Sequence, residues 1–414
     1  MKLAYVTALF PFAPAEQFFE PEIESLGEFF EVVVMPARAR RSHNYYPALR
    51  ATAQYLGALD GTVIRLALRE FLRDPRAAAA AFGSIALPAQ SLRARIVNCL
   101  LFPKALAFAH EIRRLGIEHV HVNWMTSSAT IVYVASRLTR IPFSITAHQH
   151  DIFFDNLTVP KVRAAQFVRV ISARNCRHLQ ELLPPELRGK CFVIHLGVRL
   201  PATPAVPQTR ATPHLLCAAR MCQWKGHRYL IAALALLRDQ GVPFTCDFAG
   251  DGETRGAVER DIARTGLGDR IRMLGNVPHA KLIARLESGD YDIGVLASTE
   301  QGGEHEGIPV SLMEAMAVCL PVVATRTGSI EELVDAESGL LVEQRDPVAL
   351  AAALQALIAD PARRKRLGDR GRRRVAAQFA TEATSRLLAE LLLRAAPWAG
   401  RQAEIARGGQ KSYP

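Results

Sequence analysis

Two glutamates in the last third of the chain, Glu306 and Glu314, lie at either end of an apolar run that Pro309 opens, "EGIPVSLMEAMAVCL". Glutamate is a good helix former and is common in first turns, where the helix dipole favours negative charge, so the pair could be purely structural. The surroundings favour a binding role, because three glycines between residues 302 and 307 free the backbone and proline suits the first position of a helix. Free amide groups at such a helix start form an anion site.

Two cations form a second candidate group. Arg220 ends the apolar segment "HLLCAAR", Lys225 falls in the turn after it, and Gly226 eases the entry into a helix. Two cations over a helix start would grip a diphosphate, although an arginine and a lysine in a loop are usually only solvated. The next glycine-hinged turn, "AGDGETR", is interpreted as an ordinary strand-to-helix connection.

A third group follows the segment "FSITAH". In "TAHQHD", His148, His150 and Asp151 come at the end of a predicted strand. Histidine and carboxylate together could bind a metal, but a third ligand at a suitable spacing is missing.

The elements that must position these residues alternate between strand-like and helical patterns, which is typical of parallel sheets. The predicted strands are, in a first set, "KLAYVTALF", "FEVVVMP", "HVHVNW", "FSITAH", "FVRVIS" and "CFVIHLGV", and in a second set "HLLCAAR", "FTCDFAGDG", "IRMLG", "YDIGVLAS", "PVVATRTG" and "GLLVEQ". Residues 201–213, rich in Pro and Thr, read as a linker between the sets. We therefore predict an α/β protein with two doubly wound, Rossmann-like domains that face a central cleft, where ligands collect at the carboxyl ends of the strands.

Length and composition agree with two domains, since 414 residues exceed one typical core and 49% of them are hydrophobic. The chain has no apolar run of about eighteen residues, and its N-terminus has no small-residue cleavage site, so we expect a soluble, unprocessed, cytoplasmic protein. The seven cysteines are odd in number and form no CxxC pair, which argues against a disulfide framework and a zinc site. Buried thiols are the expectation.

The net charge of +11 is concentrated in "RRKRLGDRGRRR", residues 363–374. Nucleic-acid binding is disfavoured, because the run lies in a helical pattern and no aromatic residues interleave with it. A solvated helix face or a contact with acidic lipid fits better. Residues 91–115 combine apolar runs with Arg93, Arg95 and Lys104, and they could either lie on an anionic membrane surface or form a pair of amphipathic helices packed on the first sheet.

Several motifs in fixed order carry a family resemblance. The stretches "ARMCQWKGHRYLIAAL", "FAGDGE", "LGNVPHAKL", "YDIGVLAS", "EGIPVSLMEAMAVCLPVVATRTGSIEELV" and "SGLLVEQRDPVALAAAL" resemble the retaining glycosyltransferases of family 4. In the first half, "FPFAPAEQFFEPEIESL", "IPFSITAHQHDIF" and "FVRVISARNCRHL" are similar to the subset that builds exopolysaccharides such as colanic acid. The resemblance covers about residues 1–396 and implies the GT-B fold. It implies an acceptor-binding domain over residues 1–204, a nucleotide-sugar-binding domain over 205–378 and a helix over 379–396 that returns to the first domain; residues 397–414 are expected to be a disordered tail.

The resemblance also implies roles for the donor-side residues. Glu306 would face the hydroxyls of the donor sugar and Glu314 those of the ribose, since a carboxylate accepts hydrogen bonds from two neighbouring hydroxyls. Arg220 and Lys225 would bind the diphosphate and stabilise it as it leaves. The donor-binding set is completed by Gly307, Ile308, Pro309 and Val310, and the amide groups of this stretch, except that of Pro309, would hold phosphate.

No metal and no cofactor are expected. The "DYD" at Asp290–Asp292 spells the DxD of manganese-dependent sugar transferases, but it matches the family's strand start before the donor loop. By resemblance His148 approaches the donor sugar near the reacting carbon, which makes His148, Glu306, Arg220 and Lys225 the predicted catalytic set. Acceptor-side candidates are Asn123, Trp124, His150 and Asp151, and Asn123 departs from the histidine that relatives more often carry.

The expected activity is transfer of a sugar from a UDP- or GDP-sugar to a glycan or lipid-linked acceptor, with retention of configuration and no nucleic-acid partner. A place on the inner face of the plasma membrane would suit such an acceptor. Two alternatives stay open: a nucleotide-sugar 2-epimerase of similar architecture, and a binding protein that holds the nucleotide sugar without turnover.

Overall fold

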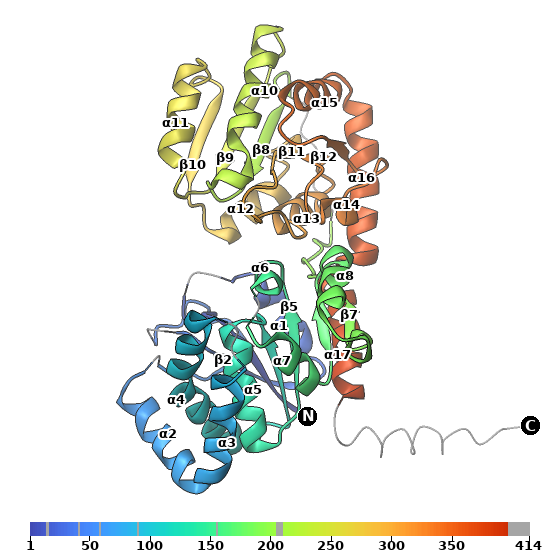
Figure 1. Ribbon diagram of the computed structural model, residues 1–414. Coiled ribbons are helices and arrows are strands. Elements are labelled where there is room, and N and C mark those ends of the chain that lie inside the picture. Colours follow the sequence, from blue (N-terminus) through green and yellow to red (C-terminus); the bar gives the residue numbers. More distant parts are fainter. Residues whose placement is uncertain are drawn as a thin grey trace, which may run out of the picture. The chain divides into compact units, whose positions relative to one another are not determined.

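The computed structural model describes residues 1–13, 16–39, 42–57, 59–88, 91–154, 156–203 and 210–395, with only the backbone of His150. The chain forms two compact units (Figure 1). One consists of Met1–His195 together with the chain from Thr384 on, and the other of Leu196–Ala383. The cleft between two domains, the domain boundaries at residues 204 and 378 and the tail over 397–414 stay predictions, and the tail lies outside the described residues.

The first unit is built on a seven-stranded sheet in the order β3-β2-β1-β4-β5-β6-β7, in which every neighbouring pair is parallel. Its strands are β1 (Lys2–Thr7), β2 (Glu31–Pro36), β3 (Thr52–Ala53), β4 (His119–Asn123), β5 (Phe143–Ala147), β6 (Val168–Val170) and β7 (Cys191–Val193). The order of the strands reverses between β1 and β4. In such sheets this is the point where ligands bind, beyond the carboxyl ends of the strands.

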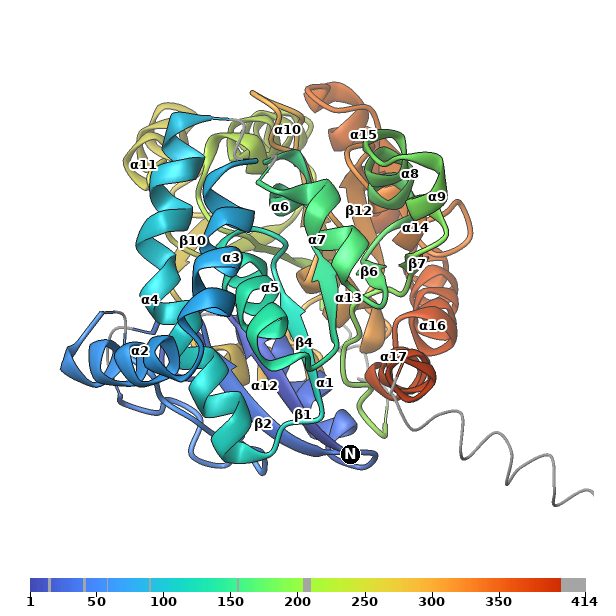
Figure 2. The same ribbon diagram turned by 60° about the horizontal axis from the view of Figure 1, so that its bottom comes forward.

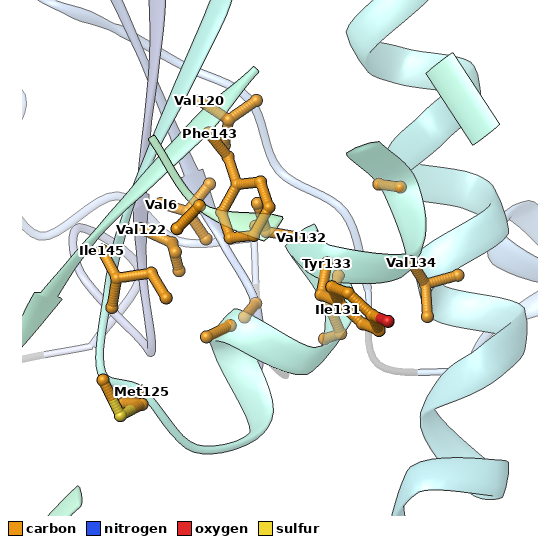
Figure 3. Close-up of a cluster of buried hydrophobic side chains, with 14 of the residues drawn as sticks. Val6, Val120, Val122, Met125, Ile131, Val132, Tyr133, Val134, Phe143 and Ile145 are labelled. Carbon is orange, nitrogen blue, oxygen red and sulfur yellow. The ribbon is translucent and has the colours of Figure 1, made fainter. Parts of the chain in front are cut away.

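Helices cover both faces of this sheet. They are α1 (Phe19–Leu26), α2 (Gly61–Arg73), α3 (Pro75–Ala86), α4 (Leu92–Leu115), α5 (Ser127–Thr139), α6 (His150–Phe153), α7 (Thr158–Ala164), α8 (Ala173–Leu182) and α9 (Pro185–Arg188). On one face, strand residues such as Val6, Val122 and Ile145 pack against Ile131 and its neighbours on α5 (Figure 3). On the other face, α1 and the last helix, α17 (Thr381–Arg394), share a second apolar cluster with β1 and β2.

The second unit repeats this plan with a six-stranded parallel sheet in the order β10-β9-β8-β11-β12-β13. The strands are β8 (His214–Ala218), β9 (Thr245–Ala249), β10 (Ile271–Gly275), β11 (Ile293–Leu296), β12 (Val322–Thr325) and β13 (Leu340–Val342). Its helices are the short 3-10 helix η1 (Gln223–Lys225), α10 (His227–Asp239), α11 (Arg255–Arg264), α12 (His279–Glu287), α13 (Val310–Ala317), α14 (Ile330–Leu333), α15 (Pro347–Ala359) and α16 (Pro361–Gln378). The strand order reverses between β8 and β11, and the candidate residues Lys225 and Glu306 follow these two strands.

The predicted α/β architecture with two doubly wound sheets is confirmed, and each of the twelve predicted strands forms. β3 was missed, because a two-residue edge strand leaves no periodic signal. Of the two alternatives left open for residues 91–115, the pair of helices is wrong, since Leu92–Leu115 form the single helix α4 with Pro103 inside it. Ser91 caps its start and Gly116, at φ 65°, ends it, and the helix continues through Pro103.

The cysteines and the basic run were also singled out in the sequence. All seven cysteines are free thiols, and five of them are buried. The basic run 363–374 lies on α16, where several arginines bond to backbone or carboxylates of their own unit, among them Arg374 with Asp335 at 2.6 Å. Within the described residues, no helix has the length and apolar character needed to cross a membrane.

Lys104 ties the middle of α4 to the loop that leads into α2. Its side chain is buried, and its Nζ donates hydrogen bonds to the carbonyl oxygens of Leu56 and Gly57. Burial disfavours the charged ammonium and lowers the pKa of Lys104 from 10.5 to about 7, although the nearby Asp60 carboxylate opposes this shift. The folded protein therefore holds this proton less firmly than the unfolded chain does.

This difference predicts a pH dependence of stability. Between pH 7 and 10.5 the unfolded state binds a proton at Lys104 that the folded state releases, so the free energy of unfolding rises with pH by roughly 4 kcal/mol across this window. Urea unfolding at several pH values should show this rise in the wild type and in the exposed control Lys281→Met, and show it reduced in Lys104→Met. An equal slope in all three proteins would contradict the assignment.

Candidate functional site

The loops after β8 and β11 bring two of the predicted residues into contact. Lys225 Nζ lies 2.6 Å from Glu306 Oε1, although the two residues are 81 positions apart. The same carboxylate oxygen accepts a hydrogen bond from the hydroxyl of Ser298, which follows β11 directly. Glu306 is 3% exposed and the Lys225 side chain 14%. The two charged groups are therefore in direct contact with little water around them, which strengthens their attraction.

Two glycines make this approach sterically allowed. Gly226 has φ 67°, and a Cβ at this position would lie 1.8 Å from the carbonyl oxygen of Ala297. Gly328 has φ 57°, and its Cβ would lie 1.7 Å from the carbonyl oxygen of Glu306. Both contacts are with backbone, which cannot swing aside as a flexible side chain can. The loops that carry Lys225 and Glu306 are thus fixed by close passes of main chain over main chain.

The start of α13 is the nearest fit to the predicted anion site. Pro309 is the residue before the helix, and no side chain caps the amide groups that follow it. Uncapped amides and the positive end of the helix dipole favour a negatively charged group there. Ile308 and Pro309 are buried, whereas Gly307 and Val310 are partly exposed, so the turn has one accessible side.

One turn into this helix, Glu314 contacts a residue that the sequence did not single out. Its Oε1 lies 2.6 Å from His279 Nε2, at the start of α12. The Glu314 side chain is 12% exposed and that of His279 41%, so the pair borders on solvent. A ligand hydroxyl could reach this carboxylate from the exposed side.

Arg220 lies apart from this pair of contacts. Its side chain is 71% exposed and forms a surface ion pair with Glu253 at 3.1 Å. A pair so exposed contributes little, so the guanidinium is free to turn toward another anion. The structure does not bring Arg220 into contact with Lys225 or Glu306.

In the first unit, His148 is buried against aromatic rings. Its ring stacks on Trp124, with centroids 4.1 Å apart, and meets the edge of Phe19 at 5.7 Å. Burial and, to a lesser extent, the nearby charge of Arg169 together lower the pKa of His148 to about 3, so the imidazole is neutral at physiological pH. Its Nε2 has no hydrogen-bond partner among the described residues.

A pocket of about 360 Å³ opens beside this stack, within the first unit. Trp124, Asp151 and Phe154 line it together with two charged residues, Glu16 and Arg38. Trp124 has φ 73° and donates from Nε1 to Glu16 Oε1 at 2.5 Å, so its ring is held in place. The pocket thus combines an aromatic face with groups of both charge signs, which suits a polar ligand with apolar faces.

The other acceptor-side candidates have different surroundings. Asn123 is fully buried and its amide donates to the carbonyl oxygen of Val6 at 3.4 Å, inside the sheet rather than in the pocket. Asp151 Oδ2 accepts from the backbone amide of Met125 at 2.7 Å, so the carboxylate also holds the turn after β4. His150 begins α6.

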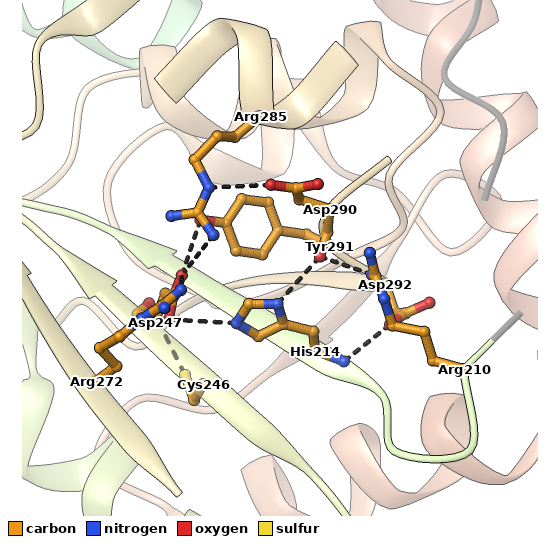
Figure 4. Close-up of polar contacts among 9 residues, drawn as sticks. All are labelled: Arg210, His214, Cys246, Asp247, Arg272, Arg285, Asp290, Tyr291 and Asp292. Carbon is orange, nitrogen blue, oxygen red and sulfur yellow. Dashed lines mark hydrogen bonds and ion pairs between the residues drawn. The ribbon is translucent and has the colours of Figure 1, made fainter. Parts of the chain in front are cut away.

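The carboxylates of the "DYD" sequence are held in a charge network around Asp247 on β9 (Figure 4). Asp290 accepts from Arg285 at 3.0 Å, while Asp292 accepts from the backbone amide of His214 at 2.8 Å. Burial favours the neutral form of Asp247, but hydrogen bonds from His214 and Arg272 outweigh it and hold its pKa below the usual range. Within the described part of the chain, no group of three or more His, Cys, Asp or Glu side chains is arranged to hold a metal ion.

Four residues at these sites were missed from the sequence: Ser298, His279, Glu16 and Arg38. Ser298 comes directly after the β11 segment, and His279 follows β10 by a few residues. The rule that ligands gather at the carboxyl ends of strands would have found both, if it had been applied to every strand. The same rule would have found Arg38, which follows β2 by two residues, whereas Glu16 lies in an irregular loop and carries no such signal.

Comparisons with known proteins find glycosyltransferases. Residues 207–374 match the family described as "Glycosyl transferases group 1". The chain is 37% identical over 210 residues to the putative colanic acid biosynthesis glycosyltransferase WcaL of Escherichia coli K12, which covers 50% of this chain and 51% of the relative. It is 36% identical over 184 residues to the amylovoran biosynthesis glycosyltransferase AmsK of Erwinia amylovora, covering 44% and 45%. The matches thus span about half the length of these curated relatives.

Solved structures match almost the whole chain at low identity. A glycosyltransferase from Rickettsia africae ESF-5 has a TM-score of 0.70 at 18% identity and covers 95% of this chain and 98% of that one. Anabaena Alr3699/HepE in complex with UDP-glucose also has a TM-score of 0.70 at 18% identity, covering 95% and 99%. At this identity the likeness establishes the fold, which is the predicted GT-B fold with two Rossmann-like domains.

The close backbone contacts at Gly226 and Gly328 predict that a side chain at either position lowers the stability of the protein. Gly226→Ala should lower the melting temperature by about 10 °C, because its Cβ has no room and its φ is positive. The matched control is Gly241→Ala, which has φ 73° but no atom within 4 Å of the new Cβ. It should lose only about 2–4 °C, the cost of the left-handed backbone. Equal losses in calorimetry would mean that the close pass does not constrain the loop.

Proposed function

We propose that the protein transfers a sugar in exopolysaccharide biosynthesis, because residues 207–374 match the family described as "Glycosyl transferases group 1". The donor in this proposal is a UDP- or GDP-sugar, and the acceptor is a lipid-linked polysaccharide precursor at the cytoplasmic face of the plasma membrane. We also propose that the enzyme retains the anomeric configuration, as family 4 members do, and needs no metal. The names of the colanic acid and amylovoran relatives support the pathway class.

The observation that carries the proposal is the contact of Lys225 with Glu306 beside the uncapped start of α13. A nucleoside diphosphate sugar offers two negatively charged phosphates and a donor sugar with vicinal hydroxyls. Lys225 and the amides of Gly307, Ile308 and Val310 would take the phosphates. The fixed carboxylate of Glu306 would accept hydrogen bonds from the sugar hydroxyls. Arg220, on its exposed and weakly paired side chain, would close on the same diphosphate.

The proposed reaction uses these cations to stabilise the departing group. The bond between the anomeric carbon and the diphosphate oxygen breaks, and the acceptor oxygen bonds to the same face of the sugar. The acceptor's proton passes to the departing phosphate oxygen, so no protein base is required. Positive charge fixed next to the developing negative charge lowers the barrier, and this is the role we assign to Lys225 and Arg220.

Glu314 would bind the ribose hydroxyls in this proposal. Its present partner, His279, is 41% exposed, so a ribose could share or replace that contact without moving the helix. We assign the acceptor to the 360 Å³ pocket, where the ring of Trp124 offers an apolar face to a sugar. His148 is proposed to approach the donor sugar, as a neutral ring with its Nε2 unpaired among the described residues.

Two other functions fit the same donor site. A nucleotide-sugar 2-epimerase would interconvert donor sugars without any acceptor, whereas a binding protein would hold the donor without turnover. Incubating the protein with UDP- and GDP-sugars alone, and then with a membrane fraction that supplies acceptors, separates the three. Label that enters lipid-extractable material supports transfer, and interconversion without acceptor supports the epimerase.

The donor site predicts a metal-independent thermal shift. UDP or GDP at about 100 times its dissociation constant should stabilise the native protein by roughly 2.7 kcal/mol and raise the melting temperature by several degrees without Mn²⁺. Glu314→Gln should lose most of this shift. The matched control Glu287→Gln, at an exposed position on α12, should keep it. A shift that needs Mn²⁺ and survives in Glu314→Gln would refute the proposed ribose contact.

The charge pair predicts a loss of turnover. Glu306→Gln and Lys225→Met should each lower kcat/KM for sugar transfer by about a hundredfold or more, because each removes a charge from the reacting region. Circular dichroism should show that the variants stay folded, and Glu287→Gln should retain wild-type turnover. Activity within a few-fold of wild type in Lys225→Met would exclude its role on the leaving group.

A further inference from the structure

Exposed apolar side chains are concentrated in one stretch of the first unit. Of twenty large hydrophobic side chains that are exposed in the described residues, eleven lie between residues 59 and 100. The second unit, by contrast, has a single one, Val348. These eleven belong to α2, α3, the first half of α4 and their connections, which lie together on one flank of the first unit (Figure 1, Figure 2). Such a concentration marks a surface with a partner.

Helix α2 shows the arrangement most clearly. Its buried stripe, Val63, Ala67 and Glu70, faces the core. Next to it runs a second apolar stripe that faces solvent: Ile64, Leu68, Phe71 and Leu72, with exposed fractions of 51%, 56%, 38% and 65%. Arg65, Arg69 and Arg73 follow at helical spacing on the far side of this stripe. The helix is therefore apolar on two adjoining faces and basic along the third.

The first half of α4 repeats this pattern. Leu92, Ile96 and Leu100, four residues apart, form a stripe with exposed fractions of 72%, 51% and 61%. Arg93 and Arg95 are exposed on either side of it. The second half of the same helix, from residue 104 on, is buried in the core of the sheet. One end of α4 thus anchors the helix while the other presents apolar and basic side chains to solvent.

The charges of this flank are almost all positive. Six arginines, at positions 65, 69, 73, 76, 93 and 95, are exposed and have no ion pair within the described residues. The acidic residues of the same stretch are used locally: Asp60 and Asp74 accept from backbone amides at the starts of α2 and α3, and Glu70 pairs with Arg113 at 3.0 Å. The surface therefore offers unpaired positive charge around exposed hydrocarbon.

We propose that α2, α3 and the first half of α4 form a docking surface for an anionic lipid bilayer. Apolar side chains enter the boundary of headgroups and acyl chains, while the arginines at their edges meet lipid phosphates, and each arginine near such a membrane contributes about 1 kcal/mol. A second copy of this chain fits less well, because a symmetric contact would set six arginines against six others. The surface lies on the membrane, since none of the described helices is built to span it.

The surface is connected to the pocket in the same unit. Asn98, on the first half of α4, donates to Asn156 Oδ1 at 2.9 Å, just beyond α6. Phe154, two residues before Asn156, is 64% exposed and lines the pocket that contains Trp124 and Asp151. An acceptor whose apolar chain stays in the bilayer could therefore present its head group to this pocket. Only this last step rests on the proposed function; the docking surface follows from exposure and charge.

Vesicle flotation of the full chain tests the proposal. Wild type should float with phosphatidylcholine vesicles in which about one lipid in three is phosphatidylglycerol, and should stay behind with pure phosphatidylcholine at moderate salt. Leu68→Glu/Leu72→Glu should lower the partition coefficient about tenfold or more, and Arg69→Gln/Arg73→Gln about fivefold per arginine removed. The control Val348→Glu/Leu387→Glu places the same acidic group at exposed positions on α15 and α17 and should bind as wild type.

Flotation needs no sugar transfer, so its outcome is independent of the proposed reaction. Failure of wild type to float, or equal loss in the control variant, would overturn the docking surface and leave the donor thermal shift unaffected. Sedimentation that shows a dimer, dissociated by Leu68→Glu/Leu72→Glu while vesicle binding is unchanged, would assign the surface to a second copy instead. Loss of the nucleotide thermal shift with intact flotation would overturn only the proposed function.

Discussion

The contact between Lys225 and Glu306 is set by backbone that passes close to backbone. At Gly226 and Gly328 the chain lies so near a neighbouring carbonyl that no side chain fits, and both glycines have a left-handed φ. Opposite charges alone would not hold this geometry, because removing two charges from water costs much of what their attraction returns. The sheet and these two glycines position the loops. As a result, Lys225 Nζ lies 2.6 Å from Glu306 Oε1. A site built in this way is already ordered before a ligand arrives, which lowers the cost of binding the proposed diphosphate.

The first unit uses buried polar contacts for a similar purpose. Arg169 has no exposed surface, and its guanidinium donates to Glu22 and to the carbonyls of Ile194 and His195. The same Glu22 accepts from the hydroxyl of Tyr5, so strands β1 and β6 are linked with α1. Arg169, Glu22 and Tyr5 all have hydrogen-bond partners. This buried charge therefore holds the strands and α1 in place without the cost of an unpaired ion. The charge of Arg169 also adds to the effect of burial in lowering the pKa of the neighbouring His148.

The two halves of α4 illustrate how one element serves both folding and interaction. From residue 104 onward its side chains complete the core, whereas residues 92–100 extend apolar groups into solvent between arginines. A helix used only for folding would place polar residues on its outer face. The proposed docking surface gives this exposed hydrocarbon a partner outside the unit, and the unpaired arginines favour an anionic one.

The sequence by itself determined the elements and their order. Alternating apolar segments located twelve strands of two parallel sheets, because burial on both faces requires continuous hydrophobic runs. Pairing between distant loops was decided only by the tertiary structure. His279 meets Glu314 and Ser298 meets Glu306 because parallel strands bring their carboxyl ends to one edge, a proximity that no local pattern records. Likewise, the apolar residues of α2 and α4 look like core residues in the sequence. Which of them face the core and which face solvent depends on how the helices are rotated against the sheet, and this is set by packing rather than by propensity.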